Sequence, residues 1–272
     1  MEQYAVGKYL IVILMCLATA SCGEKETPPT MTRLVFADEF DQDGAVDTTK
    51  WLFETVPPNN GSWWNGEKQH YTDRLDNAHI SDGTLKIVAR KDSFTVAGST
   101  KEYTSARLNS TFSFTYGRVE VRAKLPQGAG TWPAIWTLGS NIDSVNWPAC
   151  GEIDIMEHWG HDPTKISSAI HTTACSGVSN CKDHRVGTQV VKDYDSNFHT
   201  YSMEWTPESI TFYLDNQRLY AYNPRVKTAD NWPFTKDQYL LLNVAVGGAW
   251  FDVDPTFTQS TMEIDYVRVY QP

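Results

Sequence analysis

The segment Gly151-Glu152-Ile153-Asp154-Ile155-Met156-Glu157-His158 reads as a buried β-strand that nevertheless carries three carboxylates. Side chains alternate between the two faces of a strand, so Glu152 and Asp154 share one face and Glu157 would point to the other. One extra residue held in a β-bulge, with Met156 the expected one, would return Glu157 to the face of the other two acids. The segment therefore predicts a sheet with three acids along one wall.

Three clustered carboxylates indicate catalysis more than a surface strand with scattered acids. Like charges at short range raise one another's pKa, so one carboxyl can stay protonated as an acid while another remains an ionised nucleophile. Glycoside hydrolysis requires this division of labour. The apolar neighbours Ile153, Ile155 and Met156 argue against a surface strand.

The chain from about residue 31 onward repeats a strand pattern. Short alternating apolar segments lie between turn residues, and no stretch has a sustained helical period. A hairpin turn is expected at Asp215-Asn216. Many strands without crossover helices predict an all-β fold, a sandwich of two packed antiparallel sheets. Strands are expected at residues 84–88, 118–125, 165–171, 201–205, 210–214, 218–220, 239–246 and 262–270.

The composition suits one domain that acts on a neutral partner. The 272 residues are 41% hydrophobic, which is ample for a single core. The formal net charge of −10 makes nucleic acid an unfavourable partner. A polyanionic substrate would need a local basic patch that the sequence does not display, whereas a neutral polysaccharide is compatible with the charge.

The N-terminal segment has the features of an export signal. Residues 9–18 form an apolar run that is too short to span a bilayer and is typical of a signal-peptide core. The small residues before Cys22 resemble a bacterial lipobox, which predicts that Cys22 is lipidated. We expect residues 1–21 to be a lipoprotein-type signal peptide, residues 22–30 a flexible tether and residues 31–272 the catalytic domain. We therefore expect the protein to be exported. As a lipoprotein it would be held at the outer membrane or cell surface; otherwise it would be periplasmic or secreted.

Three cysteines remain outside the export segment, and an odd number cannot pair completely within the chain. Cys175 and Cys181 flank a small polar loop and could close a disulfide in an oxidising compartment. Cys150 is then expected to be a free thiol. A thiol-nucleophile enzyme that uses Cys150 with His171 is a weaker alternative, because it leaves the three acids unexplained.

The ten tryptophans are placed unevenly. Sugar rings have apolar faces on which an indole can stack while neighbouring polar groups bond the hydroxyls. Trp132 and Trp136, four residues apart, are the pair that we expect most to bind sugar. Packing roles are expected for Trp51, Trp205 and Trp232. Others lie beside the acidic motif or in segments rich in Gly, Pro and Asn: Trp63, Trp64, Trp147, Trp159 and Trp250.

His171 ends the predicted strand at residues 165–171, shortly after the acids. An antiparallel neighbour would bring it beside Glu157 or Asp154, where it could be a hydrogen-bonding residue or a catalyst. A transition-metal site formed by His158 and the acids is a weaker idea, because no H-E-x-x-H spacing is present.

The acidic motif resembles the E-x-D-x-x-E motif of glycoside hydrolase family sixteen, in particular its laminarinase-like branch, which carries the extra residue. Further segments resemble family segments in the same order, and the resemblance runs from about residue 34 to the C-terminus. These segments are Trp64-Asn65-Gly66-Glu67-Lys68-Gln69, Tyr103-Thr104-Ser105-Ala106-Arg107, Trp132-Pro133-Ala134-Ile135-Trp136, Asn243-Val244-Ala245-Val246-Gly247-Gly248 and Asp265-Tyr266-Val267-Arg268-Val269-Tyr270.

The resemblance implies a β-jelly-roll sandwich with a concave sheet as the substrate cleft. It implies that Glu152 is the nucleophile, Asp154 its assisting acid and Glu157 the acid/base. Catalysis would need no cofactor. A structural Ca²⁺ on the convex side would be bound by Glu39, the backbone carbonyl of Gly83, and Asp265. The expected sugar contacts are Asn65, Arg107, Trp132, Trp136, His171 and Trp250.

We therefore expect a monomeric, retaining endo-β-glucanase that hydrolyses β-1,3-glucan (laminarin), mixed-linkage β-1,3/1,4-glucan, or both, and that reaches the membrane through its lipid anchor. A galactan hydrolase of the agarase type would share every catalytic residue. A non-catalytic surface glycan-binding protein is the alternative from another class, but a binding module has no need for three clustered acids.

Overall fold

The computed structural model of the protein describes Met1, residues 30–176 and residues 186–272. The predicted signal peptide after Met1, the lipidation site Cys22, almost all of the tether and Cys181 lie outside these residues. Within the described ranges, the only helical element is a 3-10 turn at Trp64–Gly66, called η1. None of the helical segments found there has the length and hydrophobicity needed to cross a bilayer.

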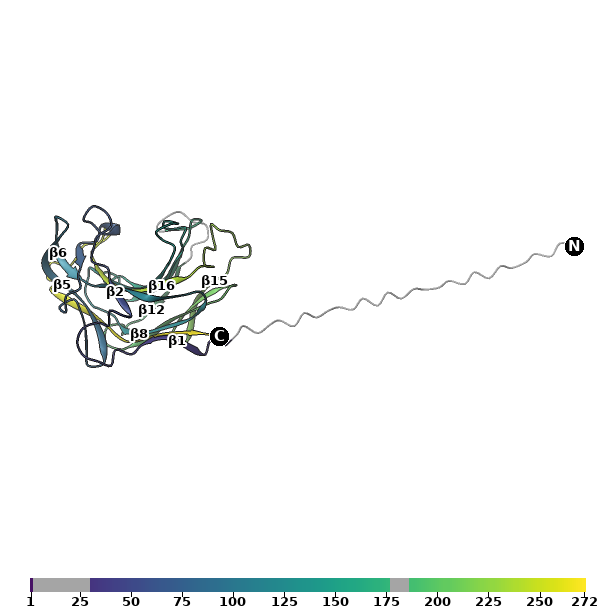
Figure 1. Cartoon of the computed structure of the whole chain (residues 1–272), viewed down its shortest axis with the longest axis horizontal. Helices are drawn as coiled ribbons and strands as arrows, with labels where there is room; N and C mark the ends of the chain where they lie inside the picture. The colour runs from purple at the N-terminus through teal and green to yellow at the C-terminus, as the bar shows by residue number, and fades with distance from the viewer. Residues whose placement is uncertain (2–29, 177–185) are drawn as a thin grey trace.

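Two sheets form the molecule, and they lie face to face as two layers (Figure 1). The ten-stranded sheet has the order β15-β14-β13-β8-β17-β5-β6-β3, with β1 paired to β17 and β4 paired to β5. All its pairs are antiparallel except β3 with β6. Its strands are β1 (Arg33–Asp38), β3 (Gln69–Tyr71), β4 (Ala78–Ser81), β5 (Thr84–Val96), β6 (Ser99–Ser105), β8 (Gly117–Lys124), β13 (His199–Trp205), β14 (Ile210–Leu214), β15 (Gln217–Tyr222) and β17 (Gln259–Gln271).

The seven-stranded sheet carries the acidic motif. Its order is β12-β11-β10-β9-β16-β7-β2, and every pair in it is antiparallel. Its strands are β2 (Trp51–Phe53), β7 (Arg107–Phe114), β9 (Thr131–Gly139), β10 (Glu152–His158), β11 (Lys165–His171), β12 (Val186–Val190) and β16 (Gln238–Val246).

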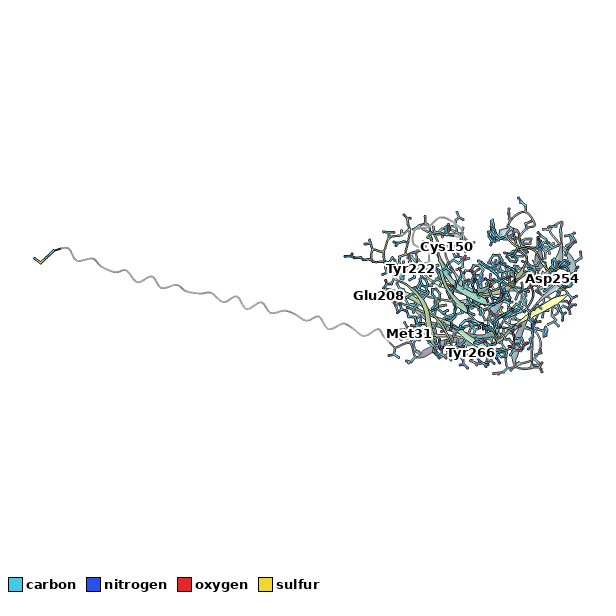
Figure 2. All side chains as sticks on the ribbon, turned by 180° about the vertical axis from the view of Figure 1, so that it is seen from behind. Met31, Cys150, Glu208, Tyr222, Asp254 and Tyr266 are labelled. Atoms are coloured by element: carbon cyan, nitrogen blue, oxygen red, sulfur yellow. The ribbon has the colours of Figure 1, made fainter. Side chains whose placement is uncertain are left out.

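The hydrophobic core fills the space between the sheets because each sheet turns alternate apolar side chains inward. In β8, Val119, Val121 and Ala123 are fully buried and alternate with half-buried charged residues. The acidic motif and the opposite sheet lie on different sides of this core. In Figure 2, Cys150, just before β10, lies on the upper side of the molecule, and Tyr266 of β17 lies on the lower side.

The sequence-based fold prediction is confirmed. Every expected strand is present, although β5 continues to Val96, well beyond the predicted end at residue 88. Asp215 and Asn216 have φ values of 48° and 64°, as a tight hairpin turn between β14 and β15 requires. The three tryptophans predicted to pack, Trp51, Trp205 and Trp232, are all buried.

Candidate active site

A β-bulge in β10 brings the three acids onto one face of the sheet. Against β9, the register runs from Asp154–Trp136 to Met156–Ile135, so Ile155 has no partner. Against β11, Asp154 pairs with Ala169 and Glu157 with Ser167, so both Ile155 and Met156 are skipped there. The predicted bulge is confirmed, but its extra residue is Ile155 rather than Met156. Consecutive residues Ile155 and Met156 both point into the core, and this restores Glu157 to the face of Asp154.

Each outer acid of the motif accepts a hydrogen bond from a tryptophan. The indole N–H of Trp147 donates to Glu152 Oε2 at 3.0 Å, and that of Trp132 donates to Glu157 Oε1, also at 3.0 Å. Trp132 lies on β9, whereas Trp147 lies in the loop between β9 and β10. The two carboxyls are therefore held from opposite ends of the bulged strand.

His171 faces the acids from the neighbouring strand, as its place at the end of β11 predicts. It pairs with Glu152 across the sheet. Its Nε2 lies 3.0 Å from Asp154 Oδ2 and 3.7 Å from Glu152 Oε1. Burial alone would lower the pKa of His171, but the charges of Asp154, Glu152 and Glu157 outweigh it and raise that pKa to about 10. His171 is thus a cation that partly neutralises the acids.

Burial raises the pKa of both Glu152 and Glu157, and the nearby charge of Asp154 raises both further. Because the carboxyls interact, their pKa values belong to the group as a whole. The group keeps a proton at pH values where isolated carboxyls would have lost it. The contacts decide where the proton lies. Each glutamate accepts one indole N–H, so these bonds do not distinguish the two. The His171 cation lies 3.7 Å from Glu152 and favours its ionised form, which makes Glu157 the carboxyl better suited to hold the proton.

The burial of these groups predicts that stability falls as the pH rises. A carboxyl whose pKa is raised in the folded state still holds its proton there at pH values where the unfolded chain has lost it. For Glu152 and Glu157 this loss of stability begins at their ordinary value of 4.5 and continues to the raised value; for His171 it runs from 6.5 to about 10. We expect Glu152→Gln to reduce the fall in Tm between about pH 5 and pH 9 by about 2–4 °C. Scanning fluorimetry would measure the fall.

The control for this measurement is Glu102→Gln, which removes a carboxylate from an exposed position. Its Tm should change with pH as that of the wild type does. If Tm falls with pH equally in Glu152→Gln and in the wild type, the electrostatic description of the site is contradicted.

Trp136 forms one wall beside the acids, and several side chains hold it. Its indole N–H donates to Asn243 Oδ1 at 2.8 Å. The Arg107 guanidinium lies over its ring at 4.7 Å and is itself 2.9 Å from Glu54. Two of the predicted sugar-binding residues, Arg107 and Trp136, therefore form one rigid unit.

A buried network continues from this wall into the molecule. The Asn243 amide donates to the Tyr71 hydroxyl at 3.2 Å, and that hydroxyl donates to Glu67 Oε2 at 3.0 Å. Gln69 donates to the same Glu67 oxygen at 2.6 Å. Burial raises the pKa of Glu67. The network begins at Asn243, which lies on the same face of the sheet as Trp136, and it fixes the orientation of Trp136.

Trp132, on the same strand as Trp136, is the centre of an aromatic cluster beside Glu157. Its ring makes edge contacts with Trp159, Trp250 and Phe251 at centroid distances of 6.3, 6.2 and 5.9 Å. Trp159 and Trp250 keep 41% and 59% of their surface exposed, so their rings are available to a ligand. The cluster joins the segment after β10 to the loop between β16 and β17.

The turn η1 places Asn65 at the surface. Asn65 has a positive φ of 62°, and its backbone carbonyl accepts a hydrogen bond from Ala249 N at 2.8 Å. This contact joins η1 to the loop that carries Trp250. Trp64 is exposed beside Asn65, whereas Trp63 is buried against Tyr71 and has a packing role.

The two side chains predicted to bind calcium, those of Glu39 and Asp265, are bonded to other groups. Both carboxylate oxygens of Glu39 accept hydrogen bonds from Arg268, at 2.8 and 2.7 Å, and Asp265 forms a close ion pair with Arg122. A cation at this position would have to displace two guanidinium groups. The side chains as arranged do not fit Ca²⁺, and calcium binding stays a prediction.

The described residues also decide between the roles predicted for the cysteines and His158. Cys150 is a free, buried thiol, as predicted, and burial beside Glu152 raises its pKa to about 11, which argues against a thiolate nucleophile. Cys175 is disulfide-bonded, and its pairing with Cys181 stays a prediction because Cys181 is not described. His158 is buried, contacts Tyr194 and donates a hydrogen bond from Nδ1 to the Lys165 carbonyl oxygen, so it does not join the acids.

Comparison with known proteins identifies the same family as the motifs. The family model described as Glycosyl hydrolases family 16 matches residues 64–268. A β-glucanase of Rhodothermus marinus is 39% identical over 275 residues, which cover 96% of this chain and 92% of the relative.

Two solved structures have the same fold. LamA of Z. galactanivorans, a variant in complex with laminaritriose and laminaritetraose, has a TM-score of 0.81 and 45% identity, with 89% of this chain and 100% of that chain covered. SCLam, a non-specific endo-β-1,3(4)-glucanase, has a TM-score of 0.82 and 40% identity, with 89% and 92% covered.

Proposed function

Because this chain belongs to glycosyl hydrolases family 16, we propose that it is a retaining endo-β-glucanase that hydrolyses β-1,3-glucan, mixed-linkage β-1,3/1,4-glucan, or both. The observation that carries the proposal is the bulged strand β10, which presents Glu152, Asp154 and Glu157 on one face together with His171. Relatives named as β-glucanase and endo-β-1,3(4)-glucanase support the substrate class. A glycan-binding protein would not need this cluster of acids.

In the first step, Glu157 gives its proton to the glycosidic oxygen while Glu152 attacks the anomeric carbon. The bond from that carbon to the leaving oxygen breaks, and a covalent glycosyl-enzyme forms. In the second step, Glu157, now ionised, takes a proton from water as the water attacks the same carbon and releases Glu152. Burial favours the protonated form of Glu157 before the first step.

Asp154 and His171 support this sequence without reacting. Asp154 lies between the two glutamates in the chain, and its charge disfavours a second negative charge on Glu157 before the proton is transferred. The His171 cation, 3.7 Å from Glu152, favours the ionised form of the nucleophile. Trp147 orients the second oxygen of Glu152 through its N–H.

Trp136 with the Arg107 cation over its ring, and the cluster of Trp132, Trp159 and Trp250, offer flat rings beside the acids. Trp132 and Trp136 both lie on β9, the strand next to the acids, so a glucan chain can stack on them beside the bond that is cleaved. Neutral glucose units match these walls, because stacking uses the apolar faces of the sugar.

A product analysis tests the proposal. The purified protein would be incubated with laminarin, barley β-glucan, lichenan and agarose, and the oligosaccharides released would be identified. We expect hydrolysis of one or more of the β-glucans, with a ladder of oligosaccharides at early times, and none of agarose. Hydrolysis of agarose alone would favour the galactan hydrolase.

We also propose that the protein is an exported, monomeric lipoprotein, anchored through Cys22. The support is in the sequence: a short apolar run, small residues before the cysteine, and a proline-containing tether after it. In the native host, the wild-type protein is expected in the membrane fraction and Cys22→Ser in the soluble fraction, because an acyl chain contributes about 0.8 kcal/mol for each buried methylene. Immunoblots of the two fractions measure the distribution. Equal amounts of both proteins in the soluble fraction would indicate plain secretion.

A further inference from the structure

The core-facing side of β11 contains a buried serine between two isoleucines. Ile166, Ser168 and Ile170 alternate with Ser167 and Ala169, so the first three side chains point into the core. The exposed fraction of Ser168 is 0%. A hydroxyl among apolar side chains costs free energy unless it makes a hydrogen bond. An apolar residue would suit this position better if packing were its only role.

The partner of this hydroxyl is the bulge in the catalytic strand. Ser168 Oγ donates to the carbonyl oxygen of Ile155 at 2.8 Å, and the bond is buried. Ile155 is the residue that has no cross-strand partner in either β9 or β11. A bulge interrupts the ladder of backbone hydrogen bonds, and a buried carbonyl released in this way needs another donor. The serine side chain supplies that donor.

The bulge separates the acid/base from the nucleophile along β10. Glu152 precedes it and keeps a regular register, opposite His171 on one side and Leu138 on the other. Glu157 follows it, opposite Ser167 and Ala134. A change at Ile155 therefore alters the position of Glu157 relative to Glu152, but leaves the nucleophile in its own register.

We propose that Ser168 is a positioning residue for Glu157, because its hydroxyl holds the bulge that turns the acid/base toward the substrate. The inference rests on the proposed function, in which Glu157 is the acid/base. Ser168 points into the core and acts through the Ile155 carbonyl, so no direct contact with the substrate is required.

The test compares two substrates that differ in their need for an acid. A glucan leaves with a sugar hydroxyl and needs protonation by Glu157, whereas a 2,4-dinitrophenyl β-glucan oligosaccharide has a leaving group that departs without it. For Ser168→Ala we expect kcat/KM on laminarin to fall by about tenfold to 10²-fold and glycosylation by the dinitrophenyl substrate to fall by less than about threefold. Burst kinetics measure the glycosylation step.

Three comparison variants accompany this test. Glu157→Ala should show the same difference between the substrates, but a larger one. Ser168→Thr keeps the hydroxyl and should restore the wild-type ratio of the two activities. Ser110→Ala removes a buried serine hydroxyl from β7 of the same sheet, where it bonds Phe112 O at 2.6 Å and Leu240 N at 2.9 Å, and should leave the ratio unchanged.

The ratio of the two activities, taken on folded protein, decides the outcome. An unchanged ratio for Ser168→Ala, with or without loss of Tm, overturns the inference as long as Glu157→Ala shows the difference. If Glu157→Ala shows no difference, the acid/base assignment itself fails, and the inference fails with it. Should Ser168→Ala not fold, Ser168→Cys, which has a similar volume and a weaker donor, must show the same change in ratio to a smaller degree.

Discussion

The Glu152→Gln variant is expected to lose hydrolysis of β-glucan by a factor on the order of 10⁴ or more. The amide cannot act as the nucleophile, so no glycosyl-enzyme forms. Gln has almost the same shape as Glu and can still accept the Trp147 N–H bond at its carbonyl oxygen. The variant should therefore fold and bind oligosaccharides. Steady-state kinetics on laminarin and calorimetric titration with a laminari-oligosaccharide would measure the two properties.

The control variant for this substitution is Glu102→Gln, whose carboxylate lies at an exposed position in β6. It should keep kcat within about twofold of the wild type, because exposed substitutions away from a site have small effects. Near-native activity in folded Glu152→Gln would show that another group attacks the anomeric carbon.

The Glu157→Ala variant is expected to lose about 10²- to 10⁴-fold in glucan hydrolysis. Both proton transfers are affected, because the same carboxyl serves as acid in the first step and as base in the second. A substrate with an activated leaving group should still form the glycosyl-enzyme, which would then hydrolyse slowly. Azide needs no base and should enter the space left by the side chain, which would speed turnover.

The product of this azide reaction is informative. Retention requires a β-glycosyl azide, because two inversions occur at the anomeric carbon. Failure of both the activated substrate and azide to restore activity, in a variant with native Tm, would contradict the acid/base role. The same reactions with Glu152→Gln should yield nothing, since no glycosyl-enzyme is present for azide to intercept.

Local patterns predicted the strands and the bulge because both depend on neighbouring residues. Alternation along residues 118–125 predicted β8, and the odd offset of Glu157 from Asp154 predicted an extra residue in β10. Which residue is unpaired was predicted wrongly. Ile155 and Met156 are both apolar and both buried, so only the register against β9 distinguishes them.

Contacts between distant segments were less accessible from the sequence. Trp63 and Trp64 are adjacent in a Gly- and Asn-rich segment, yet one packs on Tyr71 and the other is exposed. The Trp147 bond to Glu152 depends on the path of the loop before β10, although the nearness of Trp147 to the motif was a signal. Arg268 of β17 forms hydrogen bonds with Glu39, the residue after β1, and no local sequence pattern indicates this contact.

The buried polar residues around the site gave a signal that could have been used. Ser168 interrupts the apolar alternation between Ile166 and Ile170, and Asn243 interrupts the apolar run of β16. A polar residue at a buried position usually has a hydrogen-bonding role. These two positions indeed contact the bulge and Trp136.

The central claim is that Glu152 and Glu157, on one bulged strand, act as nucleophile and acid/base in a double displacement. The claim predicts carboxyl groups about 5 to 5.5 Å apart, which is too close for a water between the base and the anomeric carbon. Proton NMR of the early stages of β-glucan hydrolysis tests it most directly. The β-anomer of the new reducing end should appear first, and the α-anomer should grow in later by mutarotation. An α-anomer that appears first would contradict both the geometry and the nucleophilic role of Glu152.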